Sequence, residues 1–304
     1  MEFEQIAGLV AAACWATGSF IYSRLDVPAA AMNLAKNAIS GTLLCVSILL
    51  FGSGLVPWQA APISAYLWLI LSAVLGIQIG DAAYFRSIQI LGPRKALVLT
   101  TLTPPFSALL GWFWLAEQLE LRSLAAMALT LVGVALVIRD RNLASDRSGL
   151  HEGKARDGLL LGIFAAFCQS TGIALSKVAM EFFPPLEASA VRIVVAFLGG
   201  FLVAQSMGVL PDWKHKLRAK GVPQRLLFAS FIGTYIGIWL SLISAQAVSL
   251  AVATTQMSMT PIFMVLLVAV FLRKKIALLA FIGMAVAIAG VVLLMVPELN
   301  FFQW

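Results

Sequence analysis

Polar side chains in the middle of apolar runs are the residues of this 304-residue chain that could bind a solute. Two runs contain a threonine followed by a proline: Thr103 and Pro104 in one, and Thr260 and Pro261 in the other, 157 positions later. Proline donates no backbone hydrogen bond, so it interrupts a helix and leaves a carbonyl of the preceding turn without its usual donor. We therefore predict two broken helices, with Pro105 extending the first break, whose carbonyl and hydroxyl groups could meet a polar ligand.

Further candidates are the amides, hydroxyls and aromatic rings that stand in or beside these runs. Serine and threonine hydroxyls inside apolar helices more often bond to their own preceding carbonyl, and Trp and Tyr are common at membrane interfaces. Gln256 is a stronger candidate, because an amide offers donors and acceptors and is costly to leave unpaired. The residues predicted to line a binding cavity are Trp15, Gln78, Asp81, Tyr84, Thr100, Thr103, Gln169, Tyr235, Trp239, Gln256, Ser258 and Thr260.

Asp81 is the carboxylate that lies furthest inside an apolar run. A charge at that depth in a membrane costs at least a few kcal/mol unless it is hydrated or paired. One interpretation is a site for proton coupling or cation binding. The alternative is a structural ion pair with Arg86, Lys36 or Arg192. Lys36 and Arg192 each stand eight residues after a proline, Pro28 or Pro184, and either extend to lipid headgroups or attract an anionic group.

Composition places the chain in the membrane. Hydrophobic residues make up 61% of it, charged residues 12%, and the mean hydropathy is +0.95, whereas a soluble domain carries about 25% charged residues. The net charge of +7 is explained by basic loops and predicts no nucleic-acid partner. The three cysteines fall in apolar runs and the two histidines in charged loops, so no metal site, cofactor or disulfide framework is predicted. Sequence motifs of nucleotide binding and of hydrolases are missing, so the chain is not predicted to be an enzyme.

Ten apolar stretches are long enough to be predicted as membrane helices, since about 20 residues cross the hydrocarbon core. They cover about 6–22, 30–51, 66–88, 96–115, 123–138, 158–178, 188–207, 226–248, 251–272 and 277–296. The longest polar segment separates the fifth helix from the sixth. We therefore expect two five-helix units, residues 1–139 and 158–304, joined by a polar loop at 140–157.

The two units repeat each other. At an offset of 157, Gly76 and Gly80 become Gly233 and Gly237, and the Thr-Pro breaks correspond in the same way. Because five is odd, the second unit enters the membrane from the opposite side, as in transporters with inverted repeats. The fold class expected is an all-α membrane protein of two inverted repeats around a central cavity. The four glycines predict close packing of the third and eighth helices.

At this point the sequence resembles the EamA family of the drug/metabolite transporter superfamily. The resemblance is carried by Ala82-Ala83-Tyr84-Phe85-Arg86-Ser87, Leu91-Gly92, Pro104, Leu115-Ala116-Glu117-Gln118-Leu119 and Gly133-Val134. It implies ten helices, a cavity lined mainly by helices 1, 3, 4, 6, 8 and 9, and movement of small metabolites, often export of amino acids. The second unit departs from the pattern, with Arg273-Lys274-Lys275 where an acidic residue is expected.

The hypotheses for function are therefore a secondary exporter of amino acids or related small metabolites, an exchanger of organic phosphates or nucleotide sugars, and a membrane enzyme or structural subunit. The second would need several basic groups converging at mid-membrane, and the third has no use for two matched breaks. Expected partners are a small solute, membrane lipid and a coupling proton, with the inner membrane of a bacterium as the location. Orientation stays open: sixteen of the Lys and Arg residues lie in the loops on one side, which would put both termini outside, whereas the resemblance implies both inside.

Overall fold

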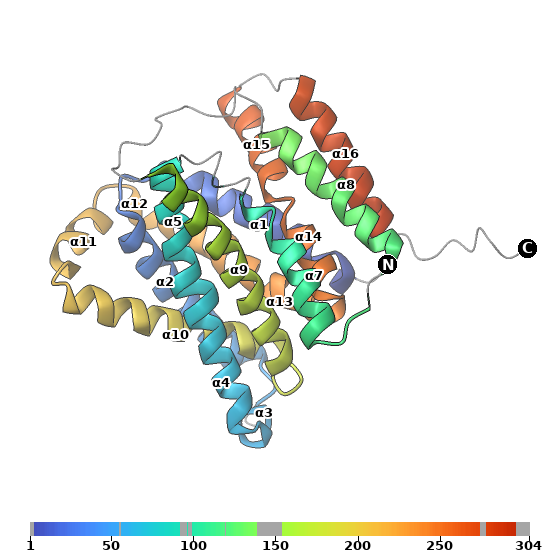
Figure 1. The fold of residues 1–304 in the computed structure, drawn as a ribbon. Coiled ribbons are helices and arrows are strands. Elements are labelled where there is room, and N and C mark those ends of the chain that lie inside the picture. The colour runs from blue at the N-terminus through green and yellow to red at the C-terminus, as the bar shows by residue number, and fades with distance from the viewer. Residues whose placement is uncertain are drawn as a thin grey trace, which may run out of the picture.

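The computed structural model describes residues 3–54, 56–91, 96, 99–118, 120–138, 154–273 and 278–295, and the described part of the chain is built of helices without strands (Figure 1). The first half contains α1 (Phe3–Tyr22), α2 (Ala29–Phe51), α3 (Val56–Ala60), α4 (Ile63–Ser72), the π-helical segment η1 (Ala73–Ile79), α5 (Gly80–Leu91), α7 (Thr103–Trp114) and α8 (Leu121–Ile138). The second half contains α9 (Ala155–Ala179), α10 (Pro185–Ser206), α11 (Leu210–Leu217), α12 (Val222–Ala229), the π-helical segment η3 (Ser230–Ile236), α13 (Gly237–Ala247), α14 (Leu250–Met257), α15 (Thr260–Leu272) and α16 (Leu278–Met295).

Among the described residues, seven helical stretches are long and apolar enough to cross a membrane, and the last of them, Leu250–Phe271, includes the break between α14 and α15. They correspond to the predicted helices 1, 2, 3, 6, 7, 8 and 9. Two shorter apolar stretches, Leu121–Val137 and Leu278–Leu293, correspond to helices 5 and 10. Of the predicted fourth helix, the described portion includes a turn at Thr101 and Leu102 followed by α7. The chain is thus a multi-pass helical membrane protein.

The backbone repeats at the same offset as the sequence. The π-helical segments η1 and η3 begin 157 residues apart, and so do α7 and α15, which both start at the threonine of a Thr-Pro pair. Ala116 and Arg273, also 157 residues apart, both have left-handed backbone angles, with φ of 53° and 51°. Such angles are rare outside glycine. Their occurrence at corresponding positions therefore shows that the backbones of the two halves repeat, in addition to their sequences.

The halves interlock through their first helices. α1 packs on η3, α13 and α15 of the second half, and α9 packs on α4, η1, α5 and α7 of the first. Both crossings are made by glycines: a Cβ on Gly18 would lie 2.8 Å from Gly233 Cα, and one on Gly172 would lie 2.7 Å from Gly76 Cα. Each predicted seam glycine therefore meets the first helix of the other half, and not its counterpart as we expected. Gly76 and Gly233 face glycines, which allows the closest backbone approach, whereas Gly80 and Gly237 face Cys168 and Trp15.

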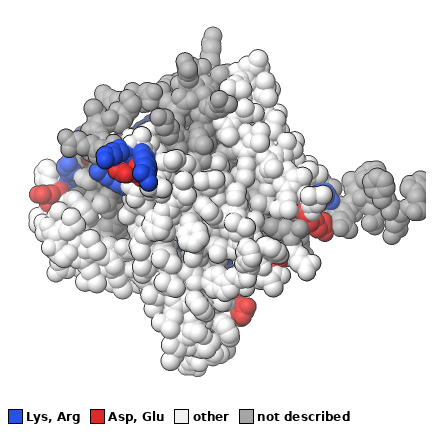
Figure 2. Space-filling view, viewed as in Figure 1, with Lys and Arg blue, Asp and Glu red and all other residues white. Residues whose placement is uncertain are grey.

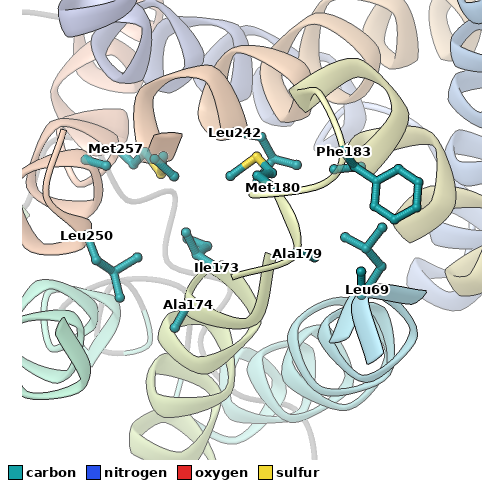
Figure 3. Close-up of a cluster of buried hydrophobic side chains, with 13 residues drawn as sticks. Leu69, Ile173, Ala174, Ala179, Met180, Phe183, Leu242, Leu250 and Met257 are labelled. Atoms are coloured by element: carbon teal, nitrogen blue, oxygen red, sulfur yellow. The ribbon is translucent and has the colours of Figure 1, made fainter. Parts of the chain in front are cut away.

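The core between the halves is apolar (Figure 3). One cluster joins Leu69 of α4 and Ile173 of α9 to Leu242 of α13 and Leu250 of α14. Phe183, 1% exposed, lies at one end of it, against Leu69 in the view of Figure 3. Outside, the middle of the face seen in Figure 2 carries few charges, and acidic and basic side chains gather toward its periphery. A surface with few charges is what contact with lipid requires.

Candidate functional site

Three charged side chains from three membrane helices converge inside the protein. Lys36 of α2 lies with its Nζ 3.7 Å from Asp81 Oδ2 of α5. Arg192 of α10 is only 5% exposed and is near enough to interact electrostatically with the same carboxylate. The structure therefore places Lys36 and Arg192, two of the partners considered for Asp81, beside its carboxylate. Because Arg192 is buried, the interpretation that its side chain extends to lipid headgroups is wrong.

Two asparagines of α2 lie within one turn of Lys36, and we group them with the three charged residues as the polar cluster, namely Asn33, Lys36, Asn37, Asp81 and Arg192. Among the described residues, Asn33 Oδ1, Asn37 Oδ1 and Arg192 Nε are buried and have no hydrogen-bond partner. Leaving such a group unsatisfied costs about 1–3 kcal/mol, more when it is charged. The cluster thus contains spare acceptors and a spare donor in a place where lipid can supply neither.

The local sequence places each of the two cations at the same point of its own helix. Pro28 and Pro184 stand immediately before α2 and α10 with extended backbone, where a proline that cannot continue a helix backwards is well placed. Lys36 and Arg192 follow at the same spacing, so they sit at the same depth of their own helices. α2 packs on α10, with a Cβ on Gly41 at 3.4 Å from Ile193 Cγ2.

The other predicted residues of the third and sixth helices lie around this cluster. Gln78 donates to the Ala196 carbonyl of α10 and borders an apolar hollow of about 410 Å³ between η1 and α10, with Val74, Ile79, Val195, Leu198, Gly199 and Val203. Tyr84 is half-buried on α5, one turn after Asp81. Gln169 is half-buried on α9, and a Cβ on Gly80 would lie 3.8 Å from its backbone nitrogen. Gln78 is therefore used to join η1 to α10.

At the breaks, side-chain hydroxyls satisfy the helix itself. Pro104 and Pro261 are buried and Pro105 is half-buried. Pro261 leaves the Met257 carbonyl without its usual donor, but Thr260 Oγ1 donates to that oxygen at 2.7 Å. Ser258 Oγ likewise donates to the Thr254 carbonyl at 2.9 Å. We expected these carbonyls to be available to a solute. In the second half, the hydroxyl of Thr260 donates to the freed carbonyl instead.

Gln256 holds two helices together. Its Nε2 donates to the Gln5 carbonyl at 2.8 Å and its Oε1 accepts from Ser244 Oγ at 3.3 Å. The residue is 1% exposed and packs on Gly8 of α1. In the first half, Thr103 is 8% exposed at the start of α7 and Thr100 is half-buried just before it.

The aromatic candidates occupy the second half's third helix and its neighbour. Tyr235 of η3 makes a 2.7 Å hydrogen bond with Ser47 of α2, and its ring lies 6.2 Å from that of Trp239. Trp15 of α1 packs on Gly237, since a Cβ there would lie 2.6 Å from the indole Cδ1. The predicted residues thus gather at the polar cluster, at the α14–α15 break and along η3, rather than at one point.

One end of the molecule is tied by an ion pair between the halves. Glu117, just after α7, lies 2.7 Å from Lys177 near the end of α9. Its carboxylate also accepts the Leu250 N–H at 2.8 Å, at the first residue of α14, and Lys177 Nζ donates to the Val248 carbonyl at 2.6 Å. A carboxylate at a helix N-terminus is favourable. This inter-half ion pair gives Glu117 a structural role at this end of the molecule.

Sequence reasoning missed the asparagines, and it missed Glu187 of α10. Glu187 is 1% exposed; its Oε1 accepts from Ser53 Oγ at 2.6 Å, and its Oε2 has no partner among the described residues. The spacing of Asn33 and Asn37, one helical turn apart in an apolar run, was a signal that could have been used. Glu187 carried no such signal, because it stands in the first turn of its helix, where acidic residues are ordinary.

Comparison with known proteins agrees with this architecture. The model of the EamA-like transporter family matches residues 3–139 and 156–296. An uncharacterized transporter of Archaeoglobus fulgidus is 26% identical over 302 residues, which cover 98% of this chain and 99% of that protein. Protein LicB of Haemophilus influenzae is 29% identical over 133 residues, 43% of this chain and 45% of LicB. A solved crystal structure superposes with a TM-score of 0.78 over 96% of both chains at 16% identity, which is a likeness of fold.

Proposed function

Because the chain belongs to the EamA-like transporter family, we propose that it is a secondary active transporter that exports amino acids or related small metabolites across the inner membrane of a bacterium. Membership in the family makes it a multi-pass membrane transporter. No nucleotide-binding motif occurs in the sequence, so an ion gradient or the solute gradient would drive it.

The mechanism we propose is alternating access between two inverted five-helix repeats, residues 1–139 and 158–304, around a central cavity. Its main support is the single offset of 157 that relates the π-helical segments, the Thr-Pro breaks and the left-handed residues of the two halves. Irregular backbone inside a membrane is tolerated where protein or a water-filled path covers it. Two such points in corresponding places allow one half to rock against the other.

The polar cluster favours an organic solute with one acidic group over a phosphate ester. Two cations and one carboxylate carry a formal charge of +1, which suits a single carboxylate better than a phosphate dianion. The exchanger of organic phosphates remains the second candidate, because Lys36 and Arg192 do converge within the membrane and not only at helix ends. An enzyme is disfavoured, since family membership points to transport.

The experiment is flux into proteoliposomes that contain the purified chain. Radiolabelled amino acids, nucleosides, polyamines and sugar phosphates are offered with and without a pH gradient, and empty liposomes are the control. We expect protein-dependent flux of at least one amino acid. Flux of sugar phosphates alone would favour the exchanger, and no protein-dependent flux of any solute would contradict the proposal.

The same assay tests Asp81 as the coupling group. If it carries the proton, the solute exchange that Asp81→Asn retains should no longer be stimulated by a pH gradient, because an amide cannot be protonated in this range. Asp157→Asn, at an exposed residue in the first turn of α9, is the matched control. An Asp81→Asn protein that keeps the full gradient dependence would exclude this role.

A further inference from the structure

We propose that the polar cluster is a binding site for a carboxylate that carries an amino or hydroxyl group on its adjacent carbon. The inference deepens the proposed function, on which it rests, by assigning the site and the recognised groups. The site lies on α2, α5 and α10, which are the second, third and seventh of the predicted helices, and so it is distinct from the broken helices.

Arg192 and Lys36 supply the donors for the carboxylate. Arg192 is 95% buried, and its Nε is a donor that no described residue accepts. Guanidinium groups bind carboxylates through paired N–H donors, and Nε is one member of such a pair. Lys36 is held loosely: its Nζ is 3.7 Å from Asp81, against 2.7 Å for the ion pair of Lys177 with Glu117. A loose pair can turn toward a ligand at less cost than a tight one.

Asn33, Asn37 and Asp81 supply acceptors for the neighbouring group. The two amide oxygens are buried and without a donor among the described residues, and they lie on α2 within one turn of Lys36. An ammonium or a hydroxyl of the ligand could donate to them, and the partly exposed Asp81 carboxylate would add charge complementarity for an ammonium. A spare donor on α10 and spare acceptors on α2, two helices that pack together, thus match a ligand that carries both kinds of group.

The ligand test uses the purified chain in detergent and thermal unfolding as the readout, because a ligand that binds only the folded state raises the melting temperature. Neutral α-amino acids and α-hydroxy acids with small, branched and aromatic side chains are offered first. The best ligand is then compared with three analogues: the carboxylic acid without the α-substituent, the amide without the carboxylate, and inorganic phosphate. We expect a saturable rise with the parent, and about a tenfold or greater loss of apparent affinity for each analogue.

The pattern of melting-temperature rises shows which class of ligand the site binds. A rise with amino acids alone makes Asp81 the ammonium partner, and a rise with hydroxy acids as well makes the asparagine oxygens sufficient; both support the site. Equal rises with the acid that lacks the α-substituent, or with phosphate, overturn the assignment, and so does no rise with any member of the panel. Flux of some other solute in proteoliposomes would then leave the proposed function standing while this site is rejected.

Two variants place the ligand. Arg192→Gln removes the charged donor and Asn37→Leu removes one spare oxygen at similar side-chain volume, so each should weaken binding about tenfold or more. Arg225→Gln, at an exposed arginine of α12, is the matched control and should bind as the parent does. If Arg192→Gln does not fold, Asn37→Leu and the analogue series still test the site. Unchanged affinity in Asn37→Leu would overturn the assignment of the asparagine oxygens as acceptors for the ligand.

Discussion

At the scale of single residues, the proline breaks depend on the hydroxyl beside them. Pro261 cannot donate to the Met257 carbonyl, and Thr260 replaces the missing N–H with its side chain. The turn can therefore be buried among helices at little cost, since the freed oxygen is met from within the segment. A break of this kind is a stable structural element and does not need a ligand to exist.

Thr260→Val should show this dependence. It keeps the shape of the side chain and leaves the Met257 oxygen unmet, so we expect a loss of about 1 kcal/mol or more in stability, measured as a lower melting temperature in detergent. Thr42→Val is the control: its Oγ1 donates to the Ala38 carbonyl at 2.8 Å, but that oxygen lies inside a regular helix. Equal effects of the two substitutions would mean that the hydroxyl is not specific to the break.

Single elements are adapted to the places where they cross. η1 and η3 lie where the third span of each half meets the first span of the other. A π-helical segment inserts extra backbone in a turn and reorients the side chains after it. In both halves, one glycine of the close pair lies within that segment, namely Gly76 in η1 and Gly233 in η3, so backbone irregularity and close approach occur together.

Gly172→Ala tests the crossing of α9 with η1. The new Cβ would lie 2.7 Å from Gly76 Cα, a distance at which backbone must move, so we expect the melting temperature to fall by the equivalent of about 1–3 kcal/mol. Gly41→Ala, whose Cβ would meet Ile193 at 3.4 Å, should be tolerated. If both proteins melt as the parent does, the helices are not held as closely as the structure has them.

For the whole molecule, a charged contact holds the two halves together at one end. The inter-half ion pair of Glu117 and Lys177 joins α7, α9 and the start of α14. The equivalent position to Glu117 in the second half is Lys274, which lies outside the described residues. A charged contact of this kind would have to part if the halves rock, so it belongs to one state of the transport cycle.

Glu117→Gln should therefore favour the state in which this end is open. We expect faster labelling of Val248→Cys by a membrane-impermeant maleimide in Glu117→Gln than in the parent background. A double-mutant cycle with Lys177→Met should give a coupling of about 1 kcal/mol, because the pair is partly exposed. Glu120→Gln, an exposed neighbour, is the control. Unchanged labelling would show that the pair does not hold this end closed.

The sequence by itself determined the class of the protein, its helices and their repetition. The signals were the length of the apolar runs, the Thr-Pro pairs and the offset that relates Gly76 to Gly233. These are local or periodic properties of the chain, so they can be identified without knowledge of the fold. The positions of Asp81 and Gln256 inside spans could also be stated, because burial in lipid follows from hydropathy.

Only the tertiary structure decided which polar groups meet. Lys36 and Arg192 are 156 residues apart and reach Asp81 because α2 and α10 pack together, and nothing in the spacing of either residue specifies that contact. In the same way, the sequence allowed Gln256 to face a cavity, but in the structure it bonds to Gln5 of α1 and Ser244 of α13. These partners lie 251 and 12 residues away in the chain. The energy of a buried polar group depends on its partners, and partners distant in the chain are chosen by packing.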